Sequence, residues 1–363
     1  MRSMTRRANQ RAGLQTAHLP PRLRLLFWDY DFTKLRWPGG RGVLLRDELR
    51  TRRATMLRQG LWVLVVAAVC LANAPARAAG EGPVTGTLTG NVLAAGDNRV
   101  MILSPEGKIV WEHKTDLTHD AWMLPNGNVL FADGSSVTEV TPDKKVVFQY
   151  KAKVAKGGGT YACQRLENGN TFIGENSTGR VLEVDKDGKV VFEMPVTPAK
   201  EGEHHNMRMA RKLKNGNYLV CHSGARTVKE YTPKGDVVLE LKVNLPGVVA
   251  FAAIRTPKDT TIVAALQKII EYDSKGAIIW EFAATDIPGV KIRNITGIQL
   301  LPDGNIAAGC YSAYDKGEGT GLFEITRDKK LVWRFADPKT ANTMMAIQKL
   351  DKDGKPLPGE CLR

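Results

Sequence analysis

The sequence predicts an all-β protein, a six-bladed β-propeller that is closed by pairing of its C-terminal strand with the N-terminal blade. Three observations predict it: a repeated pattern of turns and strands, a nearly constant spacing of the turns, and incomplete units at the two ends of the repeat. Neighbouring turns are separated by 42, 47, 43 and 45 residues, at Gly127, Gly169, Gly216, Asp259 and Gly304. A period of about 40–50 residues with about four strands per unit is typical of propeller blades.

The unit at residues 118–150 shows why each repeat should form a small antiparallel sheet. Two tight-turn sequences, Asn126-Gly127 and Pro142-Asp143-Lys144, separate three short runs rich in Val, Phe and alternating apolar residues. Such runs between turn residues are typical of strands. The same order returns after the turns at 168–170, 215–217 and 303–305, and in a more divergent form from residue 253.

The two ends of the repeat determine the number of blades. Residues 91–113 supply the second, third and fourth strands of a unit without its first strand. Residues 344–350, followed by the turn at 351–354, supply a first strand with no partner after it. The two fragments together make one blade, so that six blades close into a ring without a long open sheet edge.

Residue size predicts which strand of each unit lies at the centre of the ring. The strand before each Asn-Gly turn carries small side chains, as the crowded axis requires: Ala121, Ala162, Cys163, Ala210, Ala252, Ala253, Gly297 and Ala346. The last strand of each unit carries a large residue, expected to pack between blades as part of the core: Trp111, Phe148, Phe192, Leu239, Trp280 and Trp333.

The segment before the repeat is read as a leader. Residues 56–79 contain a short basic start, an apolar run of eleven at 61–71 and the small-residue pattern Ala76-Arg77-Ala78, which predict a signal peptide and therefore a periplasmic or secreted protein. The apolar run is too short for a membrane anchor, which needs roughly 20 residues. We expect residues 1–55 to be a non-native or mis-assigned extension, 80–354 the propeller, and 355–363 a C-terminal tail.

The formal charge of +14 is concentrated in that leader. Residues 1–55 carry +9 and residues 56–79 carry +2, so +3 remains for the rest of the chain. The sequence therefore predicts no nucleic-acid binding, which depends on a basic surface, and we expect a monomer.

Four cysteines follow the leader and no two of them form a Cys-x-x-Cys pair. Cys163, Cys221, Cys310 and Cys361 lie in different units. An oxidising compartment would permit disulfides, but the favoured interpretation is that they are buried small apolar residues.

Scarce histidines mark one end of the predicted channel. His119-Asp120 opens the inner strand of the second unit, His204-His205 opens that of the fourth, and His222 ends the second strand of the fourth. All of these positions, like the long connections at 194–205, 282–295 and 311–321, belong to the face around the channel mouth. Loops on a rigid ring commonly carry binding residues. We therefore expect a small anionic or aromatic ligand, or a protein partner, at this mouth.

The string HDAWMLPNGNVL at 119–130 resembles the HHD-x-x-x-LPNGN-x-L repeat of the bacterial arylsulfotransferase propellers, within the quinoprotein-like propeller superfamily. The resemblance extends over residues 91–354. It implies sulfuryl transfer through a channel histidine, with His119 and His205 as nucleophile candidates and Arg208 and Arg226 holding sulfonate oxygens; Asp120, His204 and His222 are further candidate ligand-binding residues. Thr118 replaces the first His of the repeat.

Other chemistries are also open to these residues. His119, Asp120, His204, His205 and His222 offer ligands suited to Zn or Cu if they converge. Pyrroloquinoline quinone is not expected, because its tryptophan docking repeat is degraded to sequences such as EVDKDGKVVFE, and we predict no cofactor. Two functions remain: a binding module without catalysis, and an arylsulfotransferase-like enzyme.

Overall fold

The computed structural model describes residues 82–153, 158–197, 203–247 and 249–363. The predicted extension at 1–55 and signal peptide at 56–79 lie outside the described residues. In the part of the chain that the structure describes, no helix has the length and apolar character needed to cross a membrane.

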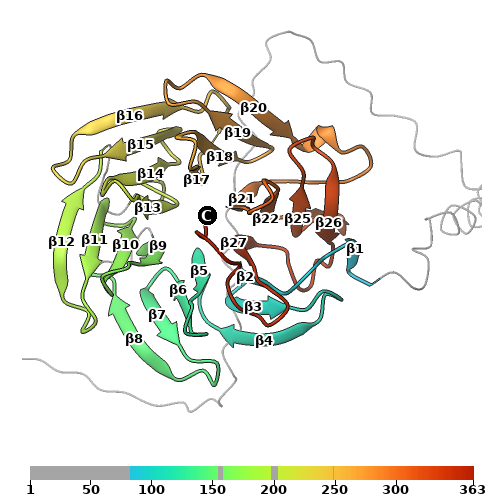
Figure 1. Ribbon diagram of the computed structural model, residues 1–363, viewed down its shortest axis with the longest axis horizontal. Helices are drawn as coiled ribbons and strands as arrows, with labels where there is room; N and C mark the ends of the chain where they lie inside the picture. The colour runs from blue at the N-terminus through green and yellow to red at the C-terminus, as the bar shows by residue number, and fades with distance from the viewer. Residues whose placement is uncertain (1–81, 154–157, 198–202, 248) are drawn as a thin grey trace, which may run out of the picture. The chain divides into compact units, whose positions relative to one another are not determined.

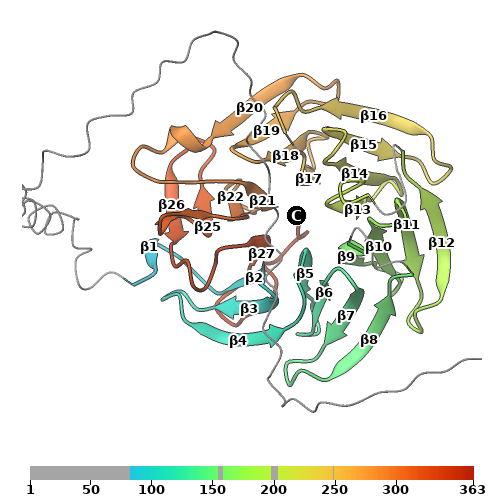
Figure 2. The ribbon, with the colours of Figure 1, turned by 180° about the vertical axis from the view of Figure 1, so that it is seen from behind.

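Six antiparallel sheets of four strands surround a common centre as the blades of a β-propeller, with the chain end inside the ring (Figure 1). The view from behind shows the same circular order (Figure 2). From the inside outwards, blade one contains β27 (Met344–Lys349), β2 (Val92–Gly96), β3 (Arg99–Leu103) and β4 (Ile109–Lys114), and blade two contains β5 (Asp120–Met123), β6 (Val129–Ala132), β7 (Ser136–Val140) and β8 (Val146–Lys151). Blade three contains, in the same order, β9 (Thr160–Arg165), β10 (Thr171–Glu175), β11 (Arg180–Val184) and β12 (Val190–Pro195).

The other three blades follow the same plan, with one added hairpin and one added edge strand. Blade four contains β13 (Ala210–Lys212), β14 (Tyr218–His222), β15 (Thr227–Tyr231) and β16 (Val237–Lys242). Blade five contains β17 (Ala252–Arg255), β18 (Thr261–Ala265), β19 (Lys268–Tyr272) and β20 (Ile278–Ala283). Blade six contains β21 (Ile295–Leu300), β22 (Ile306–Cys310), β25 (Leu322–Ile325) and β26 (Leu331–Phe335). The hairpin is β23 (Tyr314–Asp315) with β24 (Glu318–Gly319), the edge strand is β1 (Val84–Gly86), and a short 3-10 helix η1 (Ala284–Asp286) follows β20.

In blades two to six, a tight turn at each predicted position joins the two innermost strands. In blade two, the Leu124 amide donates to the Asn128 carbonyl at 2.9 Å, and the Asn128 amide donates to Asn126 Oδ1 at 3.0 Å. The turn requires a left-handed residue, and Gly127 supplies it with φ 84° because glycine has no Cβ to clash. The divergent turn of blade five uses Asp259 at φ 59° instead.

The ring closes as predicted. Strand β27 pairs antiparallel with β2, with Val92 opposite Lys349 and Ala95 opposite Ala346. Blade one is thereby assembled from both ends of the repeat. The pairing of β1 with the outer strand β26 was not predicted, since the glycine- and threonine-rich residues before β2 have no strand pattern.

The size argument for the inner strands is confirmed. Ala121, Ala162 and Ala346 are buried on strands that face the axis. Trp333 is fully buried on the outer strand of blade six. The thiols of Cys163, Cys221 and Cys310 are free and buried, and the free Cys361 is half-buried.

Candidate ligand site in the central channel

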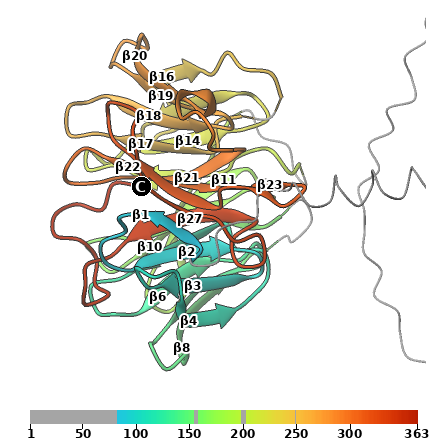
Figure 3. The same cartoon turned by 90° about the vertical axis from the view of Figure 1, so that its right-hand side faces the viewer.

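The inner strands all run in the same direction, so their first residues meet on one face of the ring. This mouth face carries the connections between blades and the β23–β24 hairpin, which projects to the right in the side view (Figure 3). Here a cavity with an empty volume of about 390 Å³, part of it open solvent, is lined by residues of several blades.

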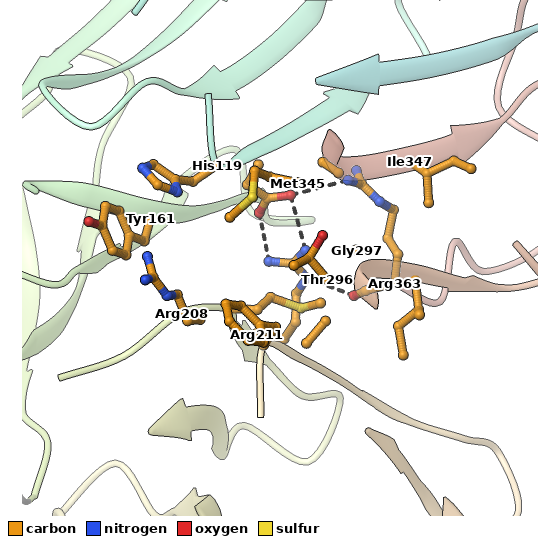
Figure 4. A pocket seen from close by; sticks show the side chains of 15 residues that line it. His119, Tyr161, Arg208, Arg211, Thr296, Gly297, Met345, Ile347 and Arg363 are labelled. Atoms are coloured by element: carbon orange, nitrogen blue, oxygen red, sulfur yellow. Dashed lines mark hydrogen bonds and ion pairs between the residues drawn. The ribbon is translucent and has the colours of Figure 1, made fainter. Parts of the chain in front are cut away.

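Arg208 lies at the mouth and points toward the cavity (Figure 4). Its guanidinium carbon lies 5.1 Å from the ring centre of Tyr161 and 5.5 Å from that of Phe251. Its Nη2 donates to His204 Nε2 at 3.1 Å and to His205 Nδ1 at 3.3 Å. Among the described residues Arg208 forms no ion pair with a carboxylate. It is therefore a half-buried cation beside aromatic rings and imidazoles.

The segment before β13 holds Arg208 in place through main-chain contacts. The Met207 amide donates to Asn176 Oδ1 at 2.9 Å, and Asn206 Nδ2 donates to the Asn176 carbonyl at 2.9 Å. The Arg208 amide donates to the Cys221 carbonyl at 2.8 Å. These contacts join blades three and four, so the orientation of Arg208 depends on both.

His119 and Tyr161 lie beside Arg208 at the mouth (Figure 4). Their ring centres are 3.8 Å apart, and the Tyr161 hydroxyl lies 2.8 Å from His204 Nδ1. The Nδ1 atom of His119 is buried and has no hydrogen-bond partner among the described residues. His119, Tyr161, His204, His205 and Arg208, here called the mouth cluster, therefore form one connected group from blades two, three and four.

Burial favours the neutral form of two imidazoles of the mouth cluster, those of His119 and His205. Burial, then the charges of Arg208 and His204, lower the pKa of His119 well below its ordinary value. The same causes lower the pKa of His205 to about 4. A guanidinium can only donate hydrogen bonds, so His204 Nε2 and His205 Nδ1 must accept, which assigns each proton to the other ring nitrogen. Near pH 7 Arg208 is therefore charged, whereas His119 and His205 are neutral.

Asp120 lies deeper, between two guanidinium groups. It is 2% exposed and forms ion pairs with Arg211 at 2.7 Å and with Arg363 at 3.1 Å, drawn as dashed lines in Figure 4. The Cys163 amide also donates to Asp120 Oδ2 at 3.0 Å. Its acceptor capacity is thus used within the protein, in contrast to the ligand-binding role expected for it.

Arg211 and Arg363 are the channel residues that sequence reasoning missed. Arg211 directly follows the predicted inner-strand residue Ala210. A charged residue on an inner strand of small residues was the one feature of the sequence that could have indicated a role for Arg211 in the channel. Nothing in the sequence pattern connects Arg363 with the channel.

His222 and Arg226 lie apart from the mouth cluster. The His222 side chain is fully buried; its Nδ1 lies 2.7 Å from the Asn206 carbonyl oxygen and its Nε2 2.7 Å from the Tyr231 hydroxyl. Arg226 is exposed at φ 59° and borders a separate surface hollow with Lys229 and Glu240.

The candidate metal ligands do not converge. Asp120 is paired with arginines, and His222 contacts Asn206 and Tyr231. No group of three or more His, Cys, Asp or Glu side chains is placed to hold a metal ion in the described ranges. Of the seven candidate site residues, the structure brings together His119, His204, His205 and Arg208.

Fold and site define a six-bladed β-propeller with a cationic, aromatic channel mouth. A protein of unknown function from Bacteroides caccae is similar, with 22% identity, a TM-score of 0.64, and coverage of 72% of this chain and 98% of that chain. A catalytically inactive virginiamycin B lyase from Staphylococcus aureus, determined with quinupristin, is also similar, with 16% identity, a TM-score of 0.51, and coverage of 71% and 90%. No family model matches the chain, and no curated protein matches it. At these identities the likeness shows the propeller fold alone.

Proposed function

We propose that this β-propeller binds a small anionic ligand at the channel mouth, with Arg208 as the main contact. One observation carries the proposal: the Arg208 guanidinium is half-buried, with its Nε atom fully buried, yet it forms no ion pair with a carboxylate in the described part of the chain. Burying an unpaired charge is costly. A bound anion offsets that cost, because it supplies the missing counter-charge.

The residue types around Arg208 favour a flat, oxygen-rich anionic group attached to an aromatic body. A guanidinium offers parallel N–H donors that match carboxylate, sulfate and phosphate oxygens. His205 carries its proton on Nε2, which can donate to a further oxygen. Tyr161 and Phe251 flank the guanidinium and offer ring faces to an aryl group. Because the paired side chains of Asp120, Arg211 and Arg363 lie in the channel below, we place the anionic head at Arg208 and the rest of the ligand outside the mouth.

A second candidate function is sulfuryl transfer from an aryl sulfate, as the resemblance to arylsulfotransferases implies. It is favoured by the neutral imidazole of His119. Its buried Nδ1 has no hydrogen-bond partner in the part of the chain that the structure describes, and its lowered pKa leaves a lone pair available near pH 7. In this reaction a histidine nitrogen bonds to sulfur, and the bond from sulfur to the phenolic oxygen breaks to release a phenolate. A phenol acceptor then attacks the sulfur, gives up its proton to solvent, and frees the histidine.

Calorimetric titration with phenyl sulfate tests the binding function. We expect Arg208→Gln to weaken binding by roughly 10- to 100-fold, because hydrogen bonds to a charged group contribute about 1.5–3 kcal/mol. Arg226→Gln is the matched control, since it removes an exposed arginine of the same blade and should leave the affinity unchanged. Equal effects of the two variants, or no binding to the unaltered protein, would contradict the proposal.

Turnover of 4-nitrophenyl sulfate with phenol as acceptor tests the enzymatic candidate. We expect His119→Ala to abolish release of nitrophenolate, and His205→Ala to reduce it through loss of a donor at the sulfonate. Unchanged turnover in both variants, or none in the unaltered protein, would eliminate sulfuryl transfer and leave the binding function standing.

A further inference from the structure

Arg363 occupies the centre of the ring, below the mouth cluster. Its residue is 4% exposed, its Nη2 donates to Asp120 Oδ1 at 3.1 Å, and its Nη1 donates to the Ala121 carbonyl. Its guanidinium carbon lies 4.3 Å from the centre of the Trp122 ring. A carboxylate, a carbonyl and an aromatic face thus surround one guanidinium, the combination that recognises this group.

The main chain beside Arg363 is anchored separately. The Leu300 amide donates to the Leu362 carbonyl at 2.9 Å, and Arg211 Nε donates to the main-chain oxygen of Arg363 at 2.7 Å. By contrast, residues 352, 353, 355 and 358–360 are exposed. The tail therefore crosses the surface and is bound mainly through its last residues.

The surroundings of the Arg363 guanidinium are held by the ring itself. Asp120 is fixed by Arg211 Nη1 at 2.7 Å and by the Cys163 amide. Trp122 is fixed by its Nε1, which donates to the Cys163 carbonyl at 2.5 Å. These contacts come from blades two, three and four and do not involve Arg363, so the site keeps its arrangement when Arg363 is replaced.

We propose that Asp120, Ala121, Trp122 and Arg211 form a recognition site for an arginine residue, which Arg363 occupies within its own chain, so that Arg363 closes the channel beneath the mouth cluster. The site takes guanidinium compounds, and it is independent of anion binding at Arg208.

The direction of entry supports the closure. Leu362 bridges to Leu300, the last residue of β21, which lies next to the turn at 301–304. Inner strands begin at the mouth face and end at these turns, so the tail enters from the opposite face. In the side view the chain end lies on the left of the ring and the β23–β24 hairpin on the right (Figure 3). Arg363 therefore lies between the mouth cluster and the opposite face of the ring.

Chemical rescue of the full-length Arg363→Ala variant tests the site. The substitution removes the guanidinium and leaves Asp120 and Trp122 in place. We expect Arg363→Ala to lower Tm, and millimolar methylguanidinium chloride to raise it again by about 2 °C or more, with no comparable rise in the unaltered protein. Methylammonium chloride at the same concentration, which has the charge but not the planar group, should not rescue. Equal responses to the two salts would overturn the proposal.

A measurement on the unaltered protein covers the case in which the variant fails to fold. Phenylglyoxal modifies accessible arginines, and mass spectrometry locates the modified residues. We expect Arg226, which is exposed, to react at least 10-fold faster than Arg363. Comparable rates would show that Arg363 does not occupy the channel, and would also overturn the proposal.

Discussion

At the residue scale, the channel contains guanidinium groups in two different environments. Arg211 and Arg363 share the carboxylate of Asp120, whereas Arg208 has imidazole and aromatic neighbours. Position in the repeat predicted that His119, His204, His205 and His222 would lie around one channel mouth, and the resemblance added Arg208; the structure groups these residues except His222, which contacts Asn206 and Tyr231. Position in the repeat could not predict their partners, since contacts between blades depend on side-chain directions that a strand pattern does not contain.

His222 is expected to make the protein less stable in acid. Burial is the largest cause that lowers its pKa to about 4, against an ordinary value of about 6.5. As pH falls from about 6.5 to about 4, the unfolded chain takes up a proton here that the folded protein does not. The free energy of unfolding should therefore fall by on the order of 3 kcal/mol over this window. Urea unfolding at a series of pH values checks this.

The variant His222→Asn separates this contribution from those of the other histidines. It should reduce the pH dependence between about 6.5 and about 4, even though it lowers stability at pH 7 by removing the contact with Tyr231. The imidazole NMR signal of His222 in the unaltered protein gives the pKa directly. A midpoint near 6.5 would show that the interpretation is wrong.

At the element scale, neighbouring blades are joined by a repeated ion pair that the turn pattern did not reveal. A glutamate in the third strand of blades two to six contacts a basic residue of the following blade: Glu139 with Arg165, Glu183 with Lys212, Glu230 with Arg255, Glu271 with Arg327, and Glu324 with Lys349. Each of these glutamate side chains is at most 10% exposed. Strand periodicity predicted the sheets, but not this pairing across their faces.

Replacing one of these glutamates should loosen the contact between two blades. Glu230 lies 2.6 Å from Arg255 and accepts from Asn217 Nδ2 at 2.7 Å. Losing one partner of a buried ion pair costs about 3–5 kcal/mol, and the partial exposure of Arg255 reduces this, so we expect Glu230→Gln to lower the free energy of unfolding by about 2 kcal/mol. Glu240→Gln, in an exposed pair with Lys229, should change it by less than about 0.5 kcal/mol.

Glu230 should also make the protein less stable in acid, but for the opposite reason to His222. The folded protein favours the charged form of Glu230, whereas it disfavours the charged form of His222. Burial raises the pKa of Glu230, but hydrogen bonds from Asn217 and Asn215 and the charge of Arg255 outweigh it, so the pKa is lowered overall. Its contribution to stability is therefore present above the ordinary glutamate value of about 4.3 and is lost as pH falls through the lower, folded-state pKa. Glu230→Gln should flatten this part of the unfolding profile, and a profile parallel to that of the unaltered protein would contradict the assignment.

At the scale of the whole molecule, sequence reasoning predicted the ring and its closure, because incomplete units at the two ends can be completed only by each other. It did not predict that the tail turns inward. Residues 355–363 have neither strand alternation nor turn spacing, and the contact of Arg363 with Asp120 joins residues 243 positions apart. The closed ring creates this contact, so no local pattern can indicate it.

Ring closure depends on the close approach of six inner strands, which Gly297→Ala should disturb. A Cβ added at Gly297 would lie 2.5 Å from the Met345 carbonyl oxygen and 2.9 Å from Ala346 Cα. These are main-chain atoms of β27, the strand that closes the ring, and they cannot move aside as a flexible side chain can. Because overpacking costs about 1–3 kcal/mol, we expect the variant to lower the free energy of unfolding by that amount. Gly82→Ala, whose nearest contact would be 3.9 Å away, is the control. Urea unfolding gives the free energy of unfolding of both variants. Equal values would contradict the close packing of β21 against β27.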